Sequence, residues 1–174
     1  MNYPEFIDDL KKSADVIDLI LAGVSQHDSE YKENKERWSL LEIVGHLLDI
    51  EKIDFRYEFE IIIADKEIPW PTFDIEELRV TNKYNEMNFI DQKKEFLSER
   101  NKSLEWLKAL KNPELDKEHY QKKVNGIKIK AGDVLASWVA HDLYHIRQIA
   151  LVKWFVLNKR IVPYSSQYSG FEYL

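Results

Sequence analysis

The sequence predicts an all-α protein, a four-helix bundle with a long crossover connection and a small hairpin before the last helix. Four long segments carry apolar residues at helical spacing. The 174 residues include only five Gly and five Pro, which leaves long stretches uninterrupted. Amphipathic helices joined by loops of varied length pack as a bundle, and this length is sufficient for one domain, residues 1–174.

The first two predicted helices cover about Pro4–Val24 and Leu40–Ala64. Proline suits the first position of a helix, where its missing N–H costs no hydrogen bond. Ser39 with Glu42 three residues later predicts a capping box at the start of the second helix, and Trp38 is placed to pack on its first turns as a hydrophobic staple.

Four further elements follow along the chain. Asp74 is expected to cap a short helix over 75–84, and Asn88 a long helix over about 89–111. Asn125-Gly126 between β-prone residues is typical of a hairpin turn within 123–129. The last helix is expected from about 132–133 to 157, and the connection before it, 111–130, is long enough to cross the bundle.

Composition excludes several classes of function. The chain has 25 basic and 31 acidic side chains, a net charge of −6, which disfavours binding to a nucleic-acid backbone. With no cysteine, it forms no disulfide and no thiolate metal site. No apolar run approaches the roughly 20 residues of a membrane span, and the start has no basic region followed by an apolar run. We therefore expect a cytoplasmic protein that does not bind membranes.

Histidine spacing is the strongest functional signal. His141 and His145 are four residues apart within an apolar stripe, so both imidazoles lie on one face of a helix with Cβ atoms about 5–6 Å apart. Two buried imidazoles without partners cost free energy, and a shared metal ion would satisfy both. His46 lies on another strongly amphipathic segment, and three neutral imidazoles with an open position would form a reactive metal centre.

Two other metal chemistries fit the sequence poorly. The segment from His141 to His145 is similar to the His-Glu-x-x-His of zinc proteases, but Asp142 replaces the glutamate base and no third histidine follows. A di-iron carboxylate bundle needs Glu-x-x-His on two helices, whereas Glu42 precedes His46 by four residues.

The chain resembles the DinB-like (DinB/YfiT) superfamily of metal-binding four-helix bundles over essentially its whole length. The residues that carry this resemblance are Trp38-Ser39, His46-Leu47 with Asp49 and Glu51, Pro69-Trp70-Pro71, Phe73-Asp74, Arg100, Ala140-His141-Asp142, His145 and Gln148. The resemblance implies His46, His141 and His145 as ligands of zinc or nickel. It also implies a homodimer and, from members with known activity, a low-molecular-weight thiol co-substrate. The chain departs from the family at the start of the last helix, where Lys130-Ala131-Gly132-Asp133 replaces a Ser or Thr cap.

Six further residues are candidates for the second shell or the pocket of this site: Glu42, Asp49, Tyr57, Asp142, Tyr144 and Gln148. Gln148 is seven residues past His141, on the same helix face, where its amide orients a ligand or bonds the backbone. Asp142 is about 100° around the helix from His141 and is expected to bond elsewhere. The capping role is favoured for Glu42, Asp49 suits a general base or a solvated position, and the tyrosines suit pocket or core, as does Trp70. His27 and His119 are expected in surface loops.

Three functions remain open. The first is a divalent-metal-dependent enzyme, similar to thiol S-transferases or hydrolases, that would lose its metal as pH falls through about 6.5, the reference histidine value. The alternative is a non-catalytic, metal-stabilised dimeric protein with a stress-related or binding role. The third, a metal-free helical interaction protein, requires that the three histidines do not converge.

Overall fold

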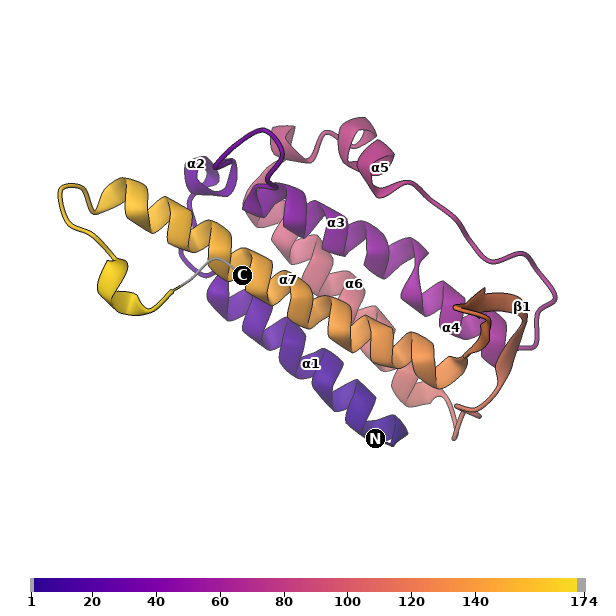
Figure 1. The fold of residues 1–174 in the computed structure, drawn as a ribbon. Helices are drawn as coiled ribbons and strands as arrows, with labels where there is room; N and C mark the ends of the chain where they lie inside the picture. The colour runs from indigo at the N-terminus through magenta and orange to yellow at the C-terminus, as the bar shows by residue number, and fades with distance from the viewer. Residues whose placement is uncertain (1, 172–174) are drawn as a thin grey trace.

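Four long helical segments form a bundle in the computed structural model, which describes residues 2–171 (Figure 1). The first is α1 (Tyr3–Ile20), and the second consists of α3 (Leu40–Ile53) and α4 (Phe55–Ile63). The third and fourth are α6 (Phe89–Ala109) and α7 (Ala131–Arg160). The predicted fold class is confirmed.

Helix α1 packs between α6 and α7, and the α3–α4 segment packs between the same two helices on the other side. The Tyr3 hydroxyl donates to the backbone oxygen of Leu107 at 2.7 Å, and Lys93 pairs with Asp18 at 2.6 Å, so α1 and α6 are antiparallel. Helix α1 is therefore diagonally opposite the α3–α4 segment, which follows it in the chain.

The second connection, residues 64–88, runs back along the length of the bundle (Figure 1). It contains α5 (Ile75–Thr81) and the short 3-10 helix η1 (Tyr84–Glu86). It has to be long because the α3–α4 segment and α6 point the same way: Lys52 pairs with Glu95 at 2.6 Å and, four residues further along both, Arg56 pairs with Glu99 at 3.9 Å. The third connection, which the sequence suggested as the crossing one, links α6 to the diagonally placed α7 across one end.

That end carries the predicted hairpin, with β1 (Glu118–Val124) antiparallel to β2 (Ile127–Lys130). Asn125 and Gly126 both have positive φ, 50° and 82°, which is why this dipeptide forms the two-residue turn. The remaining short elements are α2 (Gln26–Ser29) and η2 (Gln167–Ser169), on either side of the bundle's other end.

The second predicted helix is not continuous, because Asp54 leaves the helical conformation at φ −113° and ψ −104°. The apolar stripe explains the break. One turn after Ile50 the sequence has Asp54, and the next apolar residue, Phe55, comes one position later. Interrupting the helix at this point lets Phe55 and Phe59 face the core, where both are buried.

The helix starts confirm the predicted caps. Ser39 accepts from the backbone N–H of Glu42 while the Glu42 carboxylate accepts from that of Ser39, and Asp74 and Asn88 cap α5 and α6. At α7 the capping carboxylate is Asp133, which accepts from the backbone N–H of Lys130 at 2.9 Å.

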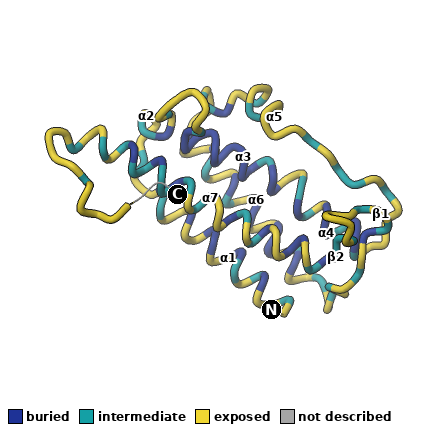
Figure 2. Tube along the Cα trace, viewed as in Figure 1, coloured by how far each residue is buried: buried dark blue, intermediate teal, exposed yellow. Residues whose placement is uncertain are grey.

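The core lies between the inner faces of the helices and consists of two apolar clusters (Figure 2). One includes Phe6, Phe55 and Trp138, and the other includes Phe96 and Ile149. Buried polar side chains separate the two clusters along α6 (Arg100 and Ser103) and α7 (Asp142 and His145). In the described chain, no helix combines the length and apolarity that crossing a membrane requires.

Helix α3 is buried on all sides over residues 40–48, because the second connection covers its outer face. Gly45 makes this close approach possible: a Cβ atom at this position would lie 2.4 Å from the Tyr84 ring. The helix axis and the covering segment are therefore closer than any side chain at 45 would allow.

We expect Gly45→Ala to lower the free energy of unfolding by about 1–3 kcal/mol, the usual cost of overpacking a core. Alanine is intrinsically the better helix former by roughly 0.5–1 kcal/mol. The measurement is urea denaturation of the native protein and of Gly45→Ala. A more stable variant would show that helix propensity outweighs overpacking and would contradict the close approach.

Candidate metal centre

Three histidines meet where α3 crosses α7. Nε2 of His141 lies 3.1 Å from Nε2 of His46 and 3.1 Å from Nε2 of His145. The four-residue spacing on α7 places His141 and His145 on one face, and antiparallel packing brings His46 opposite them. The ligand atoms of all three lie within 4.8 Å of one another, so the histidines converge as expected.

The three rings cannot satisfy one another's hydrogen bonds. Nδ1 of His145 donates to Oε1 of Gln148 at 2.8 Å, which leaves a lone pair on Nε2 of His145. Nε2 of His141 then faces two nitrogens with a single proton or a single lone pair. Whichever tautomer it adopts, one of the 3.1 Å contacts lacks a properly directed hydrogen.

Burial keeps the imidazoles neutral. Burial, together with the neighbouring histidines, lowers the pKa of His46 to about 3 and that of His141 to about 2, and burial lowers that of His145 to about 4. All three pKa values lie below the reference value of 6.5, whereas the expected loss of bound metal near that pH concerns the loaded site and stays a prediction. A neutral imidazole is the form that ligates a metal.

The fit to a divalent ion is good. Nitrogens at ~2.0–2.1 Å from one tetrahedral ion lie about 3.3 Å apart. The two 3.1 Å spacings from Nε2 of His141 are close to this value, and all three ligand atoms lie within 4.8 Å of one another. The donor set contains only imidazole nitrogen, which suits zinc, nickel, copper and iron alike. The cluster can bind a metal ion, and its composition does not select one.

A cavity of about 450 Å³ opens beside the cluster. The residues that line it are Glu36, Arg37, Trp38, His46, Ile75, His141, Tyr144, His145 and Gln148. All three histidines therefore face a space that a small molecule can enter.

A buried polar layer lies directly behind the histidines. The Arg100 guanidinium is 1% exposed and binds Asp142 through two bonds of 2.6 and 2.8 Å. It also donates to Glu51 at 2.8 Å and to the backbone oxygen of Leu10 at 3.1 Å. Burial raises the pKa of both carboxyl groups, and Arg100 opposes that rise. Asp142, next to His141 in sequence, thus serves the bundle rather than the cavity.

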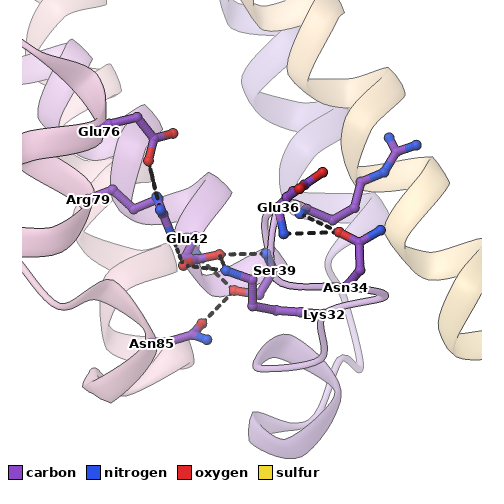
Figure 3. A network of polar contacts seen from close by, with 9 residues as sticks. Lys32, Asn34, Glu36, Ser39, Glu42, Glu76, Arg79 and Asn85 are labelled. Atoms are coloured by element: carbon purple, nitrogen blue, oxygen red, sulfur yellow. Dashed lines mark hydrogen bonds and ion pairs between the residues drawn. The ribbon is translucent and has the colours of Figure 1, made fainter.

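Glu42 is the centre of a second polar network at the start of α3 (Figure 3). Besides capping the helix, its carboxylate pairs with Lys32 at 2.9 Å and with Arg79 at 2.8 Å. Ser39 in turn donates to Asn85 at 2.5 Å. This network holds α5 and the loop before α3 against the bundle, near one rim of the cavity.

Of the other four candidate residues, two line the cavity and two do not. Tyr144, 58% exposed, and Gln148 line the cavity. Asp49 does not line it; its carboxylate accepts from Asn82 at 2.6 Å and from the Tyr84 hydroxyl. Tyr57 points to solvent, because the break at Asp54 turns Phe55 inward in its place.

His119 was expected on the surface but is 2% exposed within β1. Its Nδ1 accepts from the backbone N–H of Lys122 at 2.8 Å, and its Nε2 donates to the backbone oxygen of Ile68 at 3.2 Å. Trp70 packs edge-on against the ring. The imidazole therefore joins the hairpin to the second connection. His27 is exposed, in α2 rather than in a loop.

Two aromatic residues next to the histidines were not recognised as site residues from the sequence. Trp38 packs edge-on against His46, with centroids 5.2 Å apart, and Phe55 against His141 at 5.3 Å. The one-residue shift of the apolar stripe was a signal for Phe55. No sequence signal placed Arg37 or Ile75 on the cavity wall, because their positions depend on loop and connection geometry.

Comparison with known proteins supports the family assignment. The model of the DinB superfamily matches residues 9–149. The fold is similar to that of YfiT from Bacillus subtilis, described as a probable metal-dependent hydrolase with an unusual four-helix bundle topology: TM-score 0.74, 12% identity, 88% of this chain and 87% of that one covered. It is also similar to an uncharacterised protein from Clostridium difficile 630, with TM-score 0.67, 16% identity and coverage of 93% and 98%. No curated protein matches the chain.

Replacing Arg100 by leucine should lower the free energy of unfolding by about 3–5 kcal/mol, because Glu51 and Asp142 would be left buried without their cation. Lys102→Leu, at an exposed position of the same helix, should cost at most about 1 kcal/mol. Equal losses for the two variants in urea denaturation would show that the buried layer does not hold the bundle together.

Burial of the histidines also predicts acid sensitivity of the metal-free chain. Their pKa values in the folded state lie below the reference value of 6.5, so below this pH the histidines bind protons in the unfolded chain but not in the folded chain. The stability is present above pH 6.5 and is lost as pH falls toward about 4. Each histidine contributes roughly 2 kcal/mol to the loss between pH 7.5 and pH 5.

The measurement is urea denaturation in chelator at pH 7.5 and pH 5.0. His145→Gln should lose roughly 2 kcal/mol less than the native chain over this interval. The exposed His27→Gln should behave as the native chain does. Parallel behaviour of His145→Gln and the native chain would contradict the neutral, buried state of the cluster.

Proposed function

The chain belongs to the DinB superfamily, and we propose that it is a divalent-metal-dependent enzyme whose ion is held by His46, His141 and His145. The observation that carries the proposal is the convergence of three Nε2 atoms, on buried His46 and His145 and half-buried His141, beside a cavity that other molecules can reach. A structural metal site is closed by a fourth protein ligand, whereas a catalytic site keeps a position open. Among the described residues, no carboxylate or further histidine joins the three.

The surrounding residues hold the three imidazole rings in their orientations. Gln148 holds the Nδ1 proton of His145, which fixes the tautomer whose Nε2 lone pair faces the cluster. Trp38 and Phe55 restrain the other two rings by edge-on contacts. Tyr144, an exposed residue of the cavity lining, offers a hydroxyl that can bond a substrate.

The reaction we propose is transfer of a substrate group to a water or a thiol, as in hydrolases and thiol S-transferases. A divalent ion supplies Lewis acidity, which lowers the pKa of a water or thiol bound beside it. Because the chain has no cysteine, a thiol must arrive as a low-molecular-weight co-substrate. The description of YfiT as a probable metal-dependent hydrolase supports the water alternative.

We further propose a cytoplasmic homodimer, with zinc or nickel as the ion. The family resemblance supports the homodimer, and a ligand set made only of imidazoles suits zinc and nickel. The competing proposal is a non-catalytic, metal-stabilised dimeric protein with a stress-related or binding role. It predicts metal binding without turnover, and therefore differs from the enzyme only in substrate assays.

Tag-free protein should contain about one equivalent of zinc or nickel by mass spectrometry, and His145→Ala should contain almost none. The exposed His27→Ala serves as the control and should retain the metal. An absence of metal in every chain, with melting unchanged on addition of zinc or nickel, would refute the proposed function.

Gln148→Ala should weaken metal binding about 10- to 100-fold in competition with a chelator, the usual effect of removing a partner of a ligating histidine. Ser137→Ala, at an exposed position of the same helix, should leave the affinity unchanged. Unchanged affinity in Gln148→Ala would mean that the amide does not orient His145.

A further inference from the structure

The cavity beside the histidines continues into a smaller hollow of about 210 Å³. The two spaces share Arg37, Tyr144 and Gln148, so they form one cleft. The smaller hollow is additionally lined by Arg147 and Leu151. A ligand with one end at the histidines can therefore extend its other end to the two arginines.

The charge of this outer end is distinctive in a chain of net charge −6. Among the residues that the structure describes, its lining contains Arg37 and Arg147 and no carboxylate, since Glu36 borders only the inner cavity. Within residues 2–171, no carboxylate lies within 4.0 Å of the Arg37 guanidinium to neutralise it. Arginine offers planar paired donors that match the oxygens of carboxylates and phosphates.

The backbone that carries Arg37 is held in place on both sides. The Asn34 side-chain oxygen accepts from the backbone N–H groups of Glu36 and Arg37, each at 3.0 Å (Figure 3). On the other side, Trp38 packs against His46. The position of residue 37 relative to the histidines is thus determined by the fold, as a specificity-determining residue requires.

We propose that the substrate or co-substrate carries an anionic oxygen group, a carboxylate or a phosphate, which binds Arg37 while its reactive end lies at the histidines. The inference deepens the proposed function and rests on it for the position of the reactive end. Glu36 then disfavours an anion placed in the inner cavity, which orients the molecule with its charged group outward.

The test uses the full chain loaded with cobalt and follows the absorbance change as a thiol binds. The probes are 3-mercaptopropionate, the uncharged 3-mercaptopropionamide, and 2-mercaptoethylphosphonate, which distinguishes a phosphate-like from a carboxylate group. We expect an anionic probe to bind about fivefold more tightly than the amide, a typical effect of one partly exposed ion pair. Equal binding of all three probes, or no binding of any, would overturn the proposal.

Three variants locate the effect. Arg37→Gln should abolish the preference for the anion, Arg37→Lys should retain part of it, and Glu36→Gln should increase it. Lys35→Gln removes an equal charge from the same loop but does not border the cleft, so it should leave the preference unchanged. Equal losses in Arg37→Gln and Lys35→Gln would contradict a specific contact.

The two proposals fail in different ways. Absence of a cobalt spectrum would refute the metal site. Calorimetric titration of the native chain and Arg37→Gln with succinate and with inorganic phosphate would then test Arg37 alone. Weaker binding to the variant would support the anion subsite, and equal binding would overturn it.

Discussion

Arg100 is the contact on which the rest of the structure depends. Its guanidinium reaches from α6 to Glu51 on α3, Asp142 on α7 and a backbone oxygen of α1, so all four helical segments of the bundle meet at one buried cation. Apolar packing alone tolerates small shifts of one helix along another. A buried charge without a partner is far more costly, and this cost restricts the helices to one register.

That register also positions the candidate metal centre. Asp142 directly follows His141 in α7, and Glu51 lies five residues after His46 in α3. When Arg100 binds the two carboxylates, α3 and α7 are held at the level where His46 faces His141 and His145. The polar layer and the histidine cluster thus lie at the same level of the bundle. The two apolar clusters, one toward each end, shield both from water. The burial that raises the pKa of the carboxyl groups is also what lowers the pKa of the histidines.

Much of the fold could be predicted from the sequence because it depends on local patterns. Helical periodicity, the Ser39 and Asn88 caps and the Asn125-Gly126 turn each depend on residues only a few positions apart, and the structure confirms them. The spacing of His141 and His145 is local as well.

The partnership of His46 with this pair is a tertiary contact, which the sequence indicated through the family resemblance rather than through spacing. The burial of His119, the position of Arg37 and the route of the second connection also depend on long-range packing. The break at Asp54 had a sequence signal in the shifted apolar stripe, but capping and periodicity on both sides favoured one continuous helix.

X-ray absorption of the zinc-loaded chain tests the central claim most directly, because it reports ligand type, number and distance at the ion itself. The account predicts three imidazole nitrogens at ~2.0–2.1 Å with one or two further oxygen ligands from solvent. It also predicts that His46→Ala lowers the imidazole count by one. A shell of four protein ligands, or an imidazole count that does not respond to His46→Ala, would contradict an open three-histidine site between α3 and α7.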